Sequence, residues 1–176
     1  MKERTILVVD DEPDVAESYA LRLQGDYDVK TATGGEEALS MIDEDIDVVL
    51  LDRRMPEMSG DEVLSRIRYR NLDPSVAMLT AVEPDLDVAI MPFDDYLIKP
   101  VEREQLLSAI DRMLEAQRKE DLERELSSKK VRRNVLEVEK DDEELGASDL
   151  FQQLETDIKA LEAELTDSSS AGVSAN

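Results

Sequence analysis

Side chains suited to phosphate or metal chemistry follow several apolar segments in the first part of this chain. They are Asp10, Asp11, Asp52, Thr80 and Lys99. Asp52, for example, directly follows the apolar run VVLL at 48–51. A charged group at the end of a buried strand lowers stability unless it has partners. The repeated arrangement therefore indicates a functional site.

The aspartates among these residues predict a metal-assisted phosphoryl site. Carboxylates that converge without a cation repel one another, and Mg²⁺ relieves this because it prefers carboxylate, carbonyl and water oxygens. Mg²⁺ also holds phosphoryl oxygens, while Lys99 can supply a second positive charge and Thr80 a hydroxyl hydrogen bond. Asp52 is then predicted to be a carboxylate nucleophile that takes up a phosphoryl group as an acyl phosphate.

Strand and helix patterns alternate along residues 1–118. The predicted strands are 5–9, 27–33, 47–51, 76–79 and 96–98, and the predicted helices lie around 13–23, 36–43, 63–67 and 106–114. This alternation predicts an α/β fold, a doubly wound five-stranded parallel sheet with helices on both faces. Sites in such sheets form at the carboxyl ends of the strands, so the five side chains are expected to meet at one edge.

Four motifs resemble those of response regulator receiver domains. They are VVDDE at 8–12, LLDRRMPEMSG at 50–60, MLTA at 78–81 and DDYLIKP at 94–100. The resemblance covers residues 5 to about 116 and implies a flavodoxin-like or CheY-like sheet. It implies that Asp52 is the phosphoacceptor of a two-component system and that a sensor histidine kinase is its partner. The chain has no histidine, so the phosphodonor must be another molecule.

The same resemblance assigns the metal ligands. It implies that Asp11, Asp52 and the backbone carbonyl of Arg54 bind Mg²⁺, while Asp10 acts on the metal through water. The side chains of Arg53 and Arg54 are expected to face solvent.

The switch residues also follow from the resemblance. It implies that Thr80 and Lys99 contact the phosphoryl group and that Tyr96 changes rotamer on activation. Lys99–Pro100 is expected to be a cis peptide that turns the lysine into the site. Tyr96 could equally be an ordinary core aromatic residue.

The segment between Thr80 and Lys99 departs from the family pattern. It is shorter than expected, and Pro92-Phe93 replaces the usual Gly-Ala before Asp94-Asp95. The stretch EPDLDVAIMP leaves room for only about two helical turns. The fourth helix of the family is usually part of the output face, so this shortening affects the expected signalling surface.

Residues 119–166 resemble the haloarchaeal HalX domain, chiefly through SSKKVRRNVLEVEK at 127–140. We expect two helices, broken near Gly146, that pack on each other, on the receiver or on a second copy. Their predicted apolar seams are Leu122, Leu126, Val135 and Val138, and Leu154, Ile158, Leu161 and Leu165. The end of the chain, 167–176, is expected to be disordered.

A basic cluster at 129–133, KKVRR, lies inside this module. It could contact DNA, but acidic residues surround it and no helix-turn-helix pattern accompanies it. A solvated helical face that pairs with neighbouring glutamates is the favoured interpretation.

The acidic excess is spread over the whole chain, which has 44 Asp and Glu, 21 Lys and Arg, and a formal net charge of −23. Residues 1–118 carry −15 of this charge and residues 119–176 carry −8. The pattern resembles proteins of salt-loving archaea, although an ordinary acidic cytosolic protein is the alternative. The absence of cysteine and histidine excludes disulfides, imidazole bases and the usual zinc sites. No long apolar run is present, so we expect a cytoplasmic protein without a membrane partner.

Three functions are consistent with these features. The first is a response regulator in which phosphorylation of Asp52 changes a surface and signals through the C-terminal module. The second is a DNA-binding transcription regulator with that module as its output. The third is a phosphatase with an aspartyl intermediate, but such enzymes need a second aspartate where this chain has Arg54. In the first reading the only catalysis is self-phosphorylation and autodephosphorylation.

Overall fold

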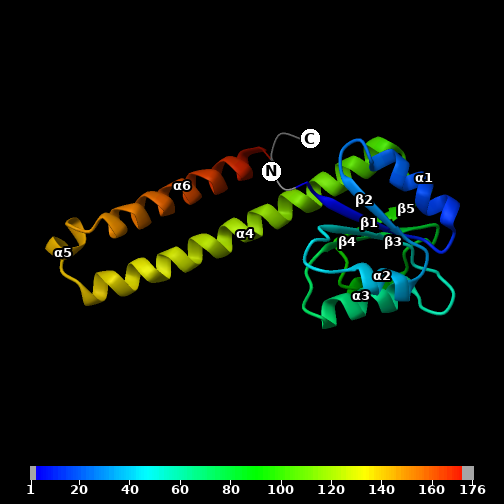
Figure 1. The fold of residues 1–176 in the computed structure, drawn as a ribbon, viewed down its shortest axis with the longest axis horizontal. Coiled ribbons are helices and arrows are strands. Elements are labelled where there is room, and N and C mark those ends of the chain that lie inside the picture. The colour runs from blue at the N-terminus through cyan, green and yellow to red at the C-terminus, as the bar shows by residue number, and fades with distance from the viewer. Residues whose placement is uncertain (1–2, 172–176) are drawn as a thin grey trace. The chain divides into compact units, whose positions relative to one another are not determined.

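The computed structural model describes residues 3–171 and contains the predicted five-stranded parallel sheet (Figure 1). Its strand order is β2-β1-β3-β4-β5, and each neighbouring pair is parallel. The strands are β1 (Thr5–Val9), β2 (Asp28–Ala32), β3 (Val48–Leu51), β4 (Ser75–Thr80) and β5 (Asp95–Ile98). The order reverses between β1 and β3, so a crevice is expected at their carboxyl ends.

Helices cover both faces of the sheet. Side chains alternate along each strand, so the strands contribute apolar residues to a packed cluster on each face. One face packs against α2 (Gly35–Met41) and α3 (Gly60–Tyr69), and the other packs against α1 (Pro13–Leu23) and the first turns of α4 (Arg103–Glu139). In β3, Val49 and Leu51 face the first pair of helices, whereas Val48 and Leu50 face the second. The prediction of a doubly wound α/β fold is therefore confirmed.

The segment between β4 and β5 is less regular than predicted. Instead of about two helical turns, it forms the short 3₁₀-helix η1 (Leu86–Ile90). Leu86 and Ile90 are both exposed, so η1 buries no apolar face whose packing would stabilise a longer helix.

Contacts within the chain define two units, Met1–Leu114 and Glu115–Asn176. The described part of the second unit contains the rest of α4, the short α5 (Asp142–Gly146) and α6 (Asp149–Ala171). The two expected helices are present, but the first continues a helix that begins at Arg103, and the short α5 lies between them. The chain does break where expected: Asp141 and Ser148 accept hydrogen bonds from the backbone N–H groups of Glu144 and Phe151, at 2.8 and 3.2 Å.

Within the second unit, α4 and α6 are joined by ion pairs. The Lys129 Nζ lies 3.1 Å from an Asp157 carboxylate oxygen, and the Lys130 Nζ lies 2.9 Å from one of Glu162. Lys129, Lys130 and Arg133 of the basic cluster pair with acids on α6, and Lys129 also lies 3.9 Å from Glu125 one turn away, so the predicted pairing with neighbouring glutamates is found in part. These contacts also lower the pKa values of Asp157 and Glu162; for Asp157 a hydrogen bond from Gln153 is the larger cause.

Only part of the predicted apolar seams is buried. Ile158 and Leu161 are buried on α6, as expected. Val135 and Val138 are instead exposed, which corrects that part of the prediction. The side of α4 toward α6 carries Lys129 and Arg133, whose aliphatic stems can cover apolar surface while their charged ends pair with Asp157 and Glu155.

The first five residues of the predicted disordered tail are helical, which corrects that part of the prediction. Residues 167–171 continue α6, and the Ser168 and Ser169 hydroxyls donate to the carbonyls of Glu164 and Leu165 at 3.0 Å. Residues 172–176 lie outside the described part. Within residues 3–171, no helix is both long and apolar enough to cross a membrane.

The acidic surface predicts that stability depends on salt. Because a net charge of −23 is spread over the chain, repulsion should weaken the fold at low ionic strength. The melting temperature should therefore rise as KCl increases from about 0.1 M to above 1 M, where the Debye length falls from roughly 10 Å to 3 Å. Circular dichroism melts across this series test the expectation, and an unchanged melting temperature would contradict it.

Candidate functional site

Three carboxylates meet at the crevice between β1 and β3. Val9 pairs with Leu51 across the two strands, and the Asp52 N–H donates to the Val9 carbonyl at 2.9 Å. Asp10 and Asp52 therefore end neighbouring strands side by side, and Asp11 follows at once. Carboxylate oxygens of the three aspartates lie within 4.8 Å of one another. The predicted convergence is thus present in the structure.

Backbone N–H groups orient two of these carboxylates. The Glu12 N–H donates to Asp10 Oδ1 at 3.0 Å, and the Arg53 N–H donates to Asp52 Oδ1 at 2.9 Å. The other oxygen of each faces Lys99. Its Nζ contacts Asp10 Oδ2 directly and lies 3.7 Å from Asp52 Oδ2. Asp52 thus keeps one oxygen, Oδ2, that no hydrogen bond to a backbone N–H occupies.

Lys99 and Thr80 come from the adjacent strands. Thr80 pairs with Ile98 at the ends of β4 and β5, and the Lys99 N–H donates to the Thr80 carbonyl at 2.8 Å. The Lys99–Pro100 peptide is cis, as expected. Thr80 is fully buried, and its Oγ1 accepts a hydrogen bond from the Val82 N–H at 3.2 Å.

The electrostatics of the site disfavour an ionised Asp52. Burial is the largest cause that raises the pKa of Asp52 above its ordinary value, and the nearby Asp10 raises it further. Lys99, a hydrogen bond with Thr80 and the Arg53 N–H lower that pKa without cancelling the effect of burial.

The donor set fits a hard divalent cation. Three carboxylates and one ammonium leave a surplus of two negative charges when all four groups are ionised. A divalent cation balances this surplus, and Mg²⁺ prefers oxygen ligands of this kind. The residues present are therefore compatible with the Mg²⁺ site that the sequence predicts.

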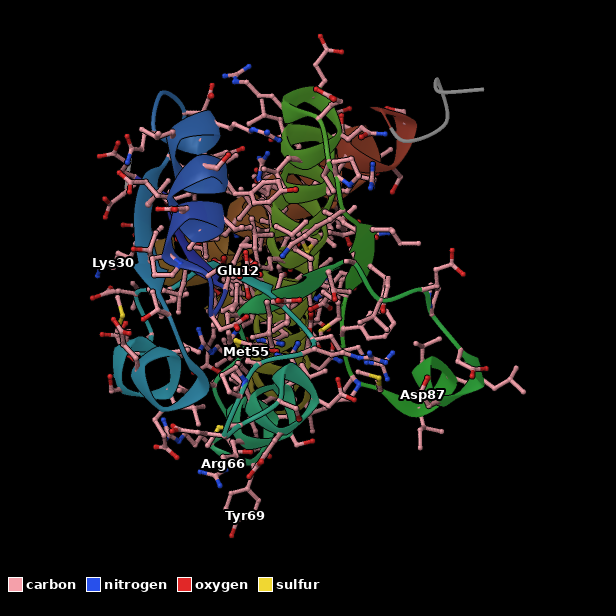
Figure 2. The ribbon with its side chains drawn as sticks, turned by 90° about the vertical axis from the view of Figure 1, so that its right-hand side faces the viewer. Glu12, Lys30, Met55, Arg66, Tyr69 and Asp87 are labelled. Carbon is pink, nitrogen blue, oxygen red and sulfur yellow. The ribbon has the colours of Figure 1, made fainter. Side chains whose placement is uncertain are left out.

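The site opens to solvent through a pocket of about 680 Å³. Asp10, Asp52, Thr80 and Lys99 line it. Glu12, labelled in Figure 2 at the start of α1, also lines this pocket. Arg54 lines it from the loop after β3, and its side chain is exposed as expected.

Tyr96 lies beside the segment that follows Thr80. Its hydroxyl donates to the Val82 carbonyl at 2.6 Å, and its ring meets Phe93 edge-on at a centroid distance of 5.6 Å. Val82 therefore links the two predicted switch residues, because its N–H donates to Thr80 and its carbonyl accepts from Tyr96. A rotamer change of Tyr96 stays a prediction.

Arg53 is the site residue that the sequence analysis placed wrongly. Its side chain is only 9% exposed, although solvent exposure was expected. Its Nε lies 3.0 Å from Asp61 Oδ1 at the start of α3, and its Nη2 contacts Asp87 on η1 (labelled in Figure 2). The hydrogen bond with Asp61 is the main cause that raises the pKa of Arg53, so the group stays charged. In the sequence, the position of Asp61 at the start of a helix could have indicated a partner for Arg53, whereas nothing in the sequence marked Asp87 as one.

Family comparisons agree with this geometry. A profile of the response regulator receiver domain matches residues 6–111, and a profile of the HalX domain matches residues 117–172. A putative transcriptional regulator of Haloferax volcanii is 44% identical over 163 residues, which is 92% of this chain and 28% of that protein. The response regulator SaeR of Staphylococcus aureus is 32% identical over 118 residues, which is 65% of this chain and 52% of SaeR. The chain thus spans about half or less of these relatives' lengths.

A solved structure shares the receiver fold. The response regulator protein TrrA from Thermotoga maritima, in complex with Mg²⁺ and BeF, superposes with a TM-score of 0.56 and 35% identity. The match covers 62% of this chain and 98% of TrrA.

Proposed function

The chain belongs to the response regulator receiver family and carries a HalX domain, and on this premise we propose that Asp52 is its phosphoacceptor. The observation that carries the proposal is the placement of Asp52 in an open pocket, with its Oδ1 held by the Arg53 N–H and its Oδ2 3.7 Å from the Lys99 ammonium. A partner sensor histidine kinase, or a small acyl phosphate, supplies the phosphoryl group. The phosphoryl transfer takes place in the cytoplasm, where such a kinase presents its phosphorylated domain.

The transfer forms one bond and breaks one. Asp52 Oδ2 bonds to phosphorus while the bond from phosphorus to the donor atom breaks, and the donor leaves with that electron pair. Asp11, Asp52 and the Arg54 carbonyl would hold Mg²⁺, with Asp10 acting through water, and the bound ion would supply positive charge to the phosphoryl oxygens. The Arg53 N–H keeps the carboxylate oriented during attack.

Lys99 and Thr80 respond to the new phosphoryl group. The Lys99 ammonium, which contacts Asp10 beforehand, gains a more highly charged partner in the phosphoryl oxygens. The Thr80 hydroxyl donates to another of those oxygens, which moves the segment through Val82 that also holds Tyr96. A rotamer change of Tyr96 then alters the surface near β5. The protein is a switch, and its only catalysis is its own phosphorylation and dephosphorylation.

The C-terminal helices are the proposed output of this switch, through another protein or a second copy of the chain. A DNA-binding transcription regulator is the second candidate, supported by the name of the Haloferax volcanii relative. Against it, Lys129, Lys130 and Arg133 are already paired with acids on α6, which leaves little free positive charge for phosphates. The relative from a salt-loving archaeon and the charge of −23 support a halophilic source.

The proposed function predicts a labile, Mg²⁺-dependent phosphoryl group on Asp52. Incubation with acetyl phosphate and MgCl₂ in about 1 M KCl, where exposed charges are screened, should add one phosphoryl group by intact mass. EDTA should prevent the addition, and hydroxylamine should remove it, since an acyl phosphate is the product. An Asp52→Ala variant that is labelled as fully as the parent protein would refute the assignment.

A further inference from the structure

An exposed apolar stripe runs along α4 in the second unit. We define this valine stripe as Val131, Val135 and Val138, whose exposed fractions are 59%, 56% and 82%. Their spacing of four and three residues places them on one side of the helix. The opposite side is occupied, because Lys129 and Arg133 there pair with Asp157 and Glu155 of α6. The valine stripe thus faces away from α6 and is left uncovered within its own unit.

Two opposite charges flank the valine stripe on the same side. Arg132 and Glu139 are seven residues apart, which is close to two helical turns, so both lie along one edge of the stripe. Both side chains are exposed, and neither has an ion pair or hydrogen bond to another described residue. Most other charges of α4 at this level are paired, as Lys129 and Lys130 are. A free cation and a free anion therefore border an uncovered apolar surface.

We propose that the valine stripe is the contact between two copies of this chain, whose α4 helices pack antiparallel about a twofold axis near Val135. In such a pair each contact occurs twice, and residues on the same edge of the stripe face each other. Arg132 of each copy then lies opposite Glu139 of the other, since the axis falls midway between them. Val135 lies beside its own counterpart, and Val131 lies near Val138 of the second copy.

The charge pattern along α4 favours a second copy of the chain as the partner, and it favours antiparallel over parallel packing. The stretch 129–133 is KKVRR, and in this register it lies opposite the end of α4 of the second copy, which closes on Glu139 and is followed by Asp141 and Asp142. A parallel arrangement would instead place KKVRR beside KKVRR. With a net charge of −23, two copies repel each other overall, so an association needs a contact with locally opposite charges. The contact is small, so we expect a dimer that dissociates on dilution. It does not depend on phosphorylation of Asp52.

Sedimentation velocity of the full chain in about 1 M KCl tests the valine stripe as the dimer contact, because this salt concentration screens the repulsion between the two acidic copies. The parent protein should pass from monomer to dimer as its concentration rises. Val135→Glu should remain monomeric, and its helix content should not change because the side chain is exposed. Leu150→Glu is the matched control, since Leu150 is 85% exposed on α6. A parent protein that is monomeric throughout, or a Val135→Glu variant that dimerises normally, would overturn the proposal.

Charge reversal tests the register. Arg132→Glu and Glu139→Arg should each weaken dimerisation about tenfold, because each creates two like-charge contacts. The double variant restores opposite charges across the axis and should dimerise about as well as the parent protein. Two single variants that weaken the dimer and a double variant that weakens it further would overturn the assigned pairing.

Single cysteines test the direction of the helices, since the chain contains none. Val135→Cys should form a disulfide-linked dimer on oxidation. Val131→Cys alone should not, because the two sulfur-bearing residues would lie about 13 Å apart along the helix axis, well beyond the roughly 7 Å limit for Cα atoms in a disulfide. Mixing Val131→Cys with Val138→Cys should give the mixed dimer. Efficient self-linking of all three variants would indicate a parallel pair and refute the proposal.

Discussion

Asp52→Asn is expected to raise the melting temperature at neutral pH by roughly 4 °C, which corresponds to a gain of about 1 kcal/mol, while it abolishes phosphoryl uptake. The physical reason is the raised pKa of Asp52 in the folded protein, caused chiefly by burial and secondarily by Asp10. At neutral pH the ionised carboxylate is therefore less favourable in the folded state than in the unfolded chain. Asparagine keeps the shape of the side chain and removes this charge.

The pH dependence of that gain has a defined sign. Because the folded-state pKa lies above the ordinary value of 3.8, the folded state binds the proton more tightly than the unfolded state. The stability contributed by protonated Asp52 is present below pH 3.8 and is lost as pH rises through the folded-state pKa. The advantage of Asp52→Asn should consequently be largest at neutral pH and should vanish in acid.

Thermal melts of Asp52→Asn and the parent protein between acid and neutral pH measure this effect. Asp28→Asn, an exposed site on β2, removes the same unit of charge and controls for net charge. Saturating Mg²⁺ should stabilise the parent protein more than the variant and so narrow the difference. A variant that melts below the parent protein at neutral pH would show that Lys99 outweighs burial at Asp52.

The geometry of the candidate site was predictable because local sequence patterns determine it. Each apolar run that precedes Asp10, Asp52 or Thr80 is a buried strand, and parallel pairing brings the strand ends to one edge of the sheet. The positions of these side chains are set by the strands themselves and do not depend on the paths of long loops. The same logic placed Lys99 beside β4, although its direct contact with Asp10 required the three-dimensional structure.

The environment of Arg53 was not predictable in the same way. Its burial depends on Asp61 and Asp87, which approach from α3 and from the irregular segment before β5. The path of that segment follows from tertiary packing, and no apolar period in the sequence marks it. A charged residue after a strand was therefore assigned to solvent by default.

The packed side of α4 in the second unit was also assigned wrongly, because it too depends on tertiary contacts. Counting apolar residues put Val135 and Val138 on the buried seam, yet Lys129 and Arg133 occupy that side of the helix. Long basic side chains can cover apolar surface with their stems while their charged ends pair with acids. In a chain with this much charge, apolarity alone does not identify the packed face of a helix.

Gly60→Ala is expected to damage both the fold and the site. Gly60 begins α3, and its N–H donates to the Arg53 carbonyl at 2.8 Å. A Cβ added to Gly60 would lie 2.1 Å from the Asp52 carbonyl oxygen and 2.9 Å from the Arg53 Cα. Both are backbone atoms, so the loop that carries Asp52 must move to relieve the overlap.

This displacement should lower the free energy of unfolding by about 3 kcal/mol, with a fall in melting temperature of roughly 10–20 °C. It should also slow phosphorylation by acetyl phosphate on the order of a hundredfold, because it shifts the Arg53 N–H that orients Asp52. Labelling must be measured well below the variant's melting temperature, so that unfolding does not contribute to the loss.

Gly146→Ala supplies the matched control for Gly60→Ala. Gly146 ends α5, and a Cβ there would meet no atom within 4 Å. This variant should melt and be labelled like the parent protein. If Gly60→Ala also retained the parent's melting temperature and labelling rate, the close packing of α3 against the Asp52 loop would have no part in positioning the phosphoacceptor. The expected contrast between the two glycines thus tests whether the site depends on backbone contact at the start of α3.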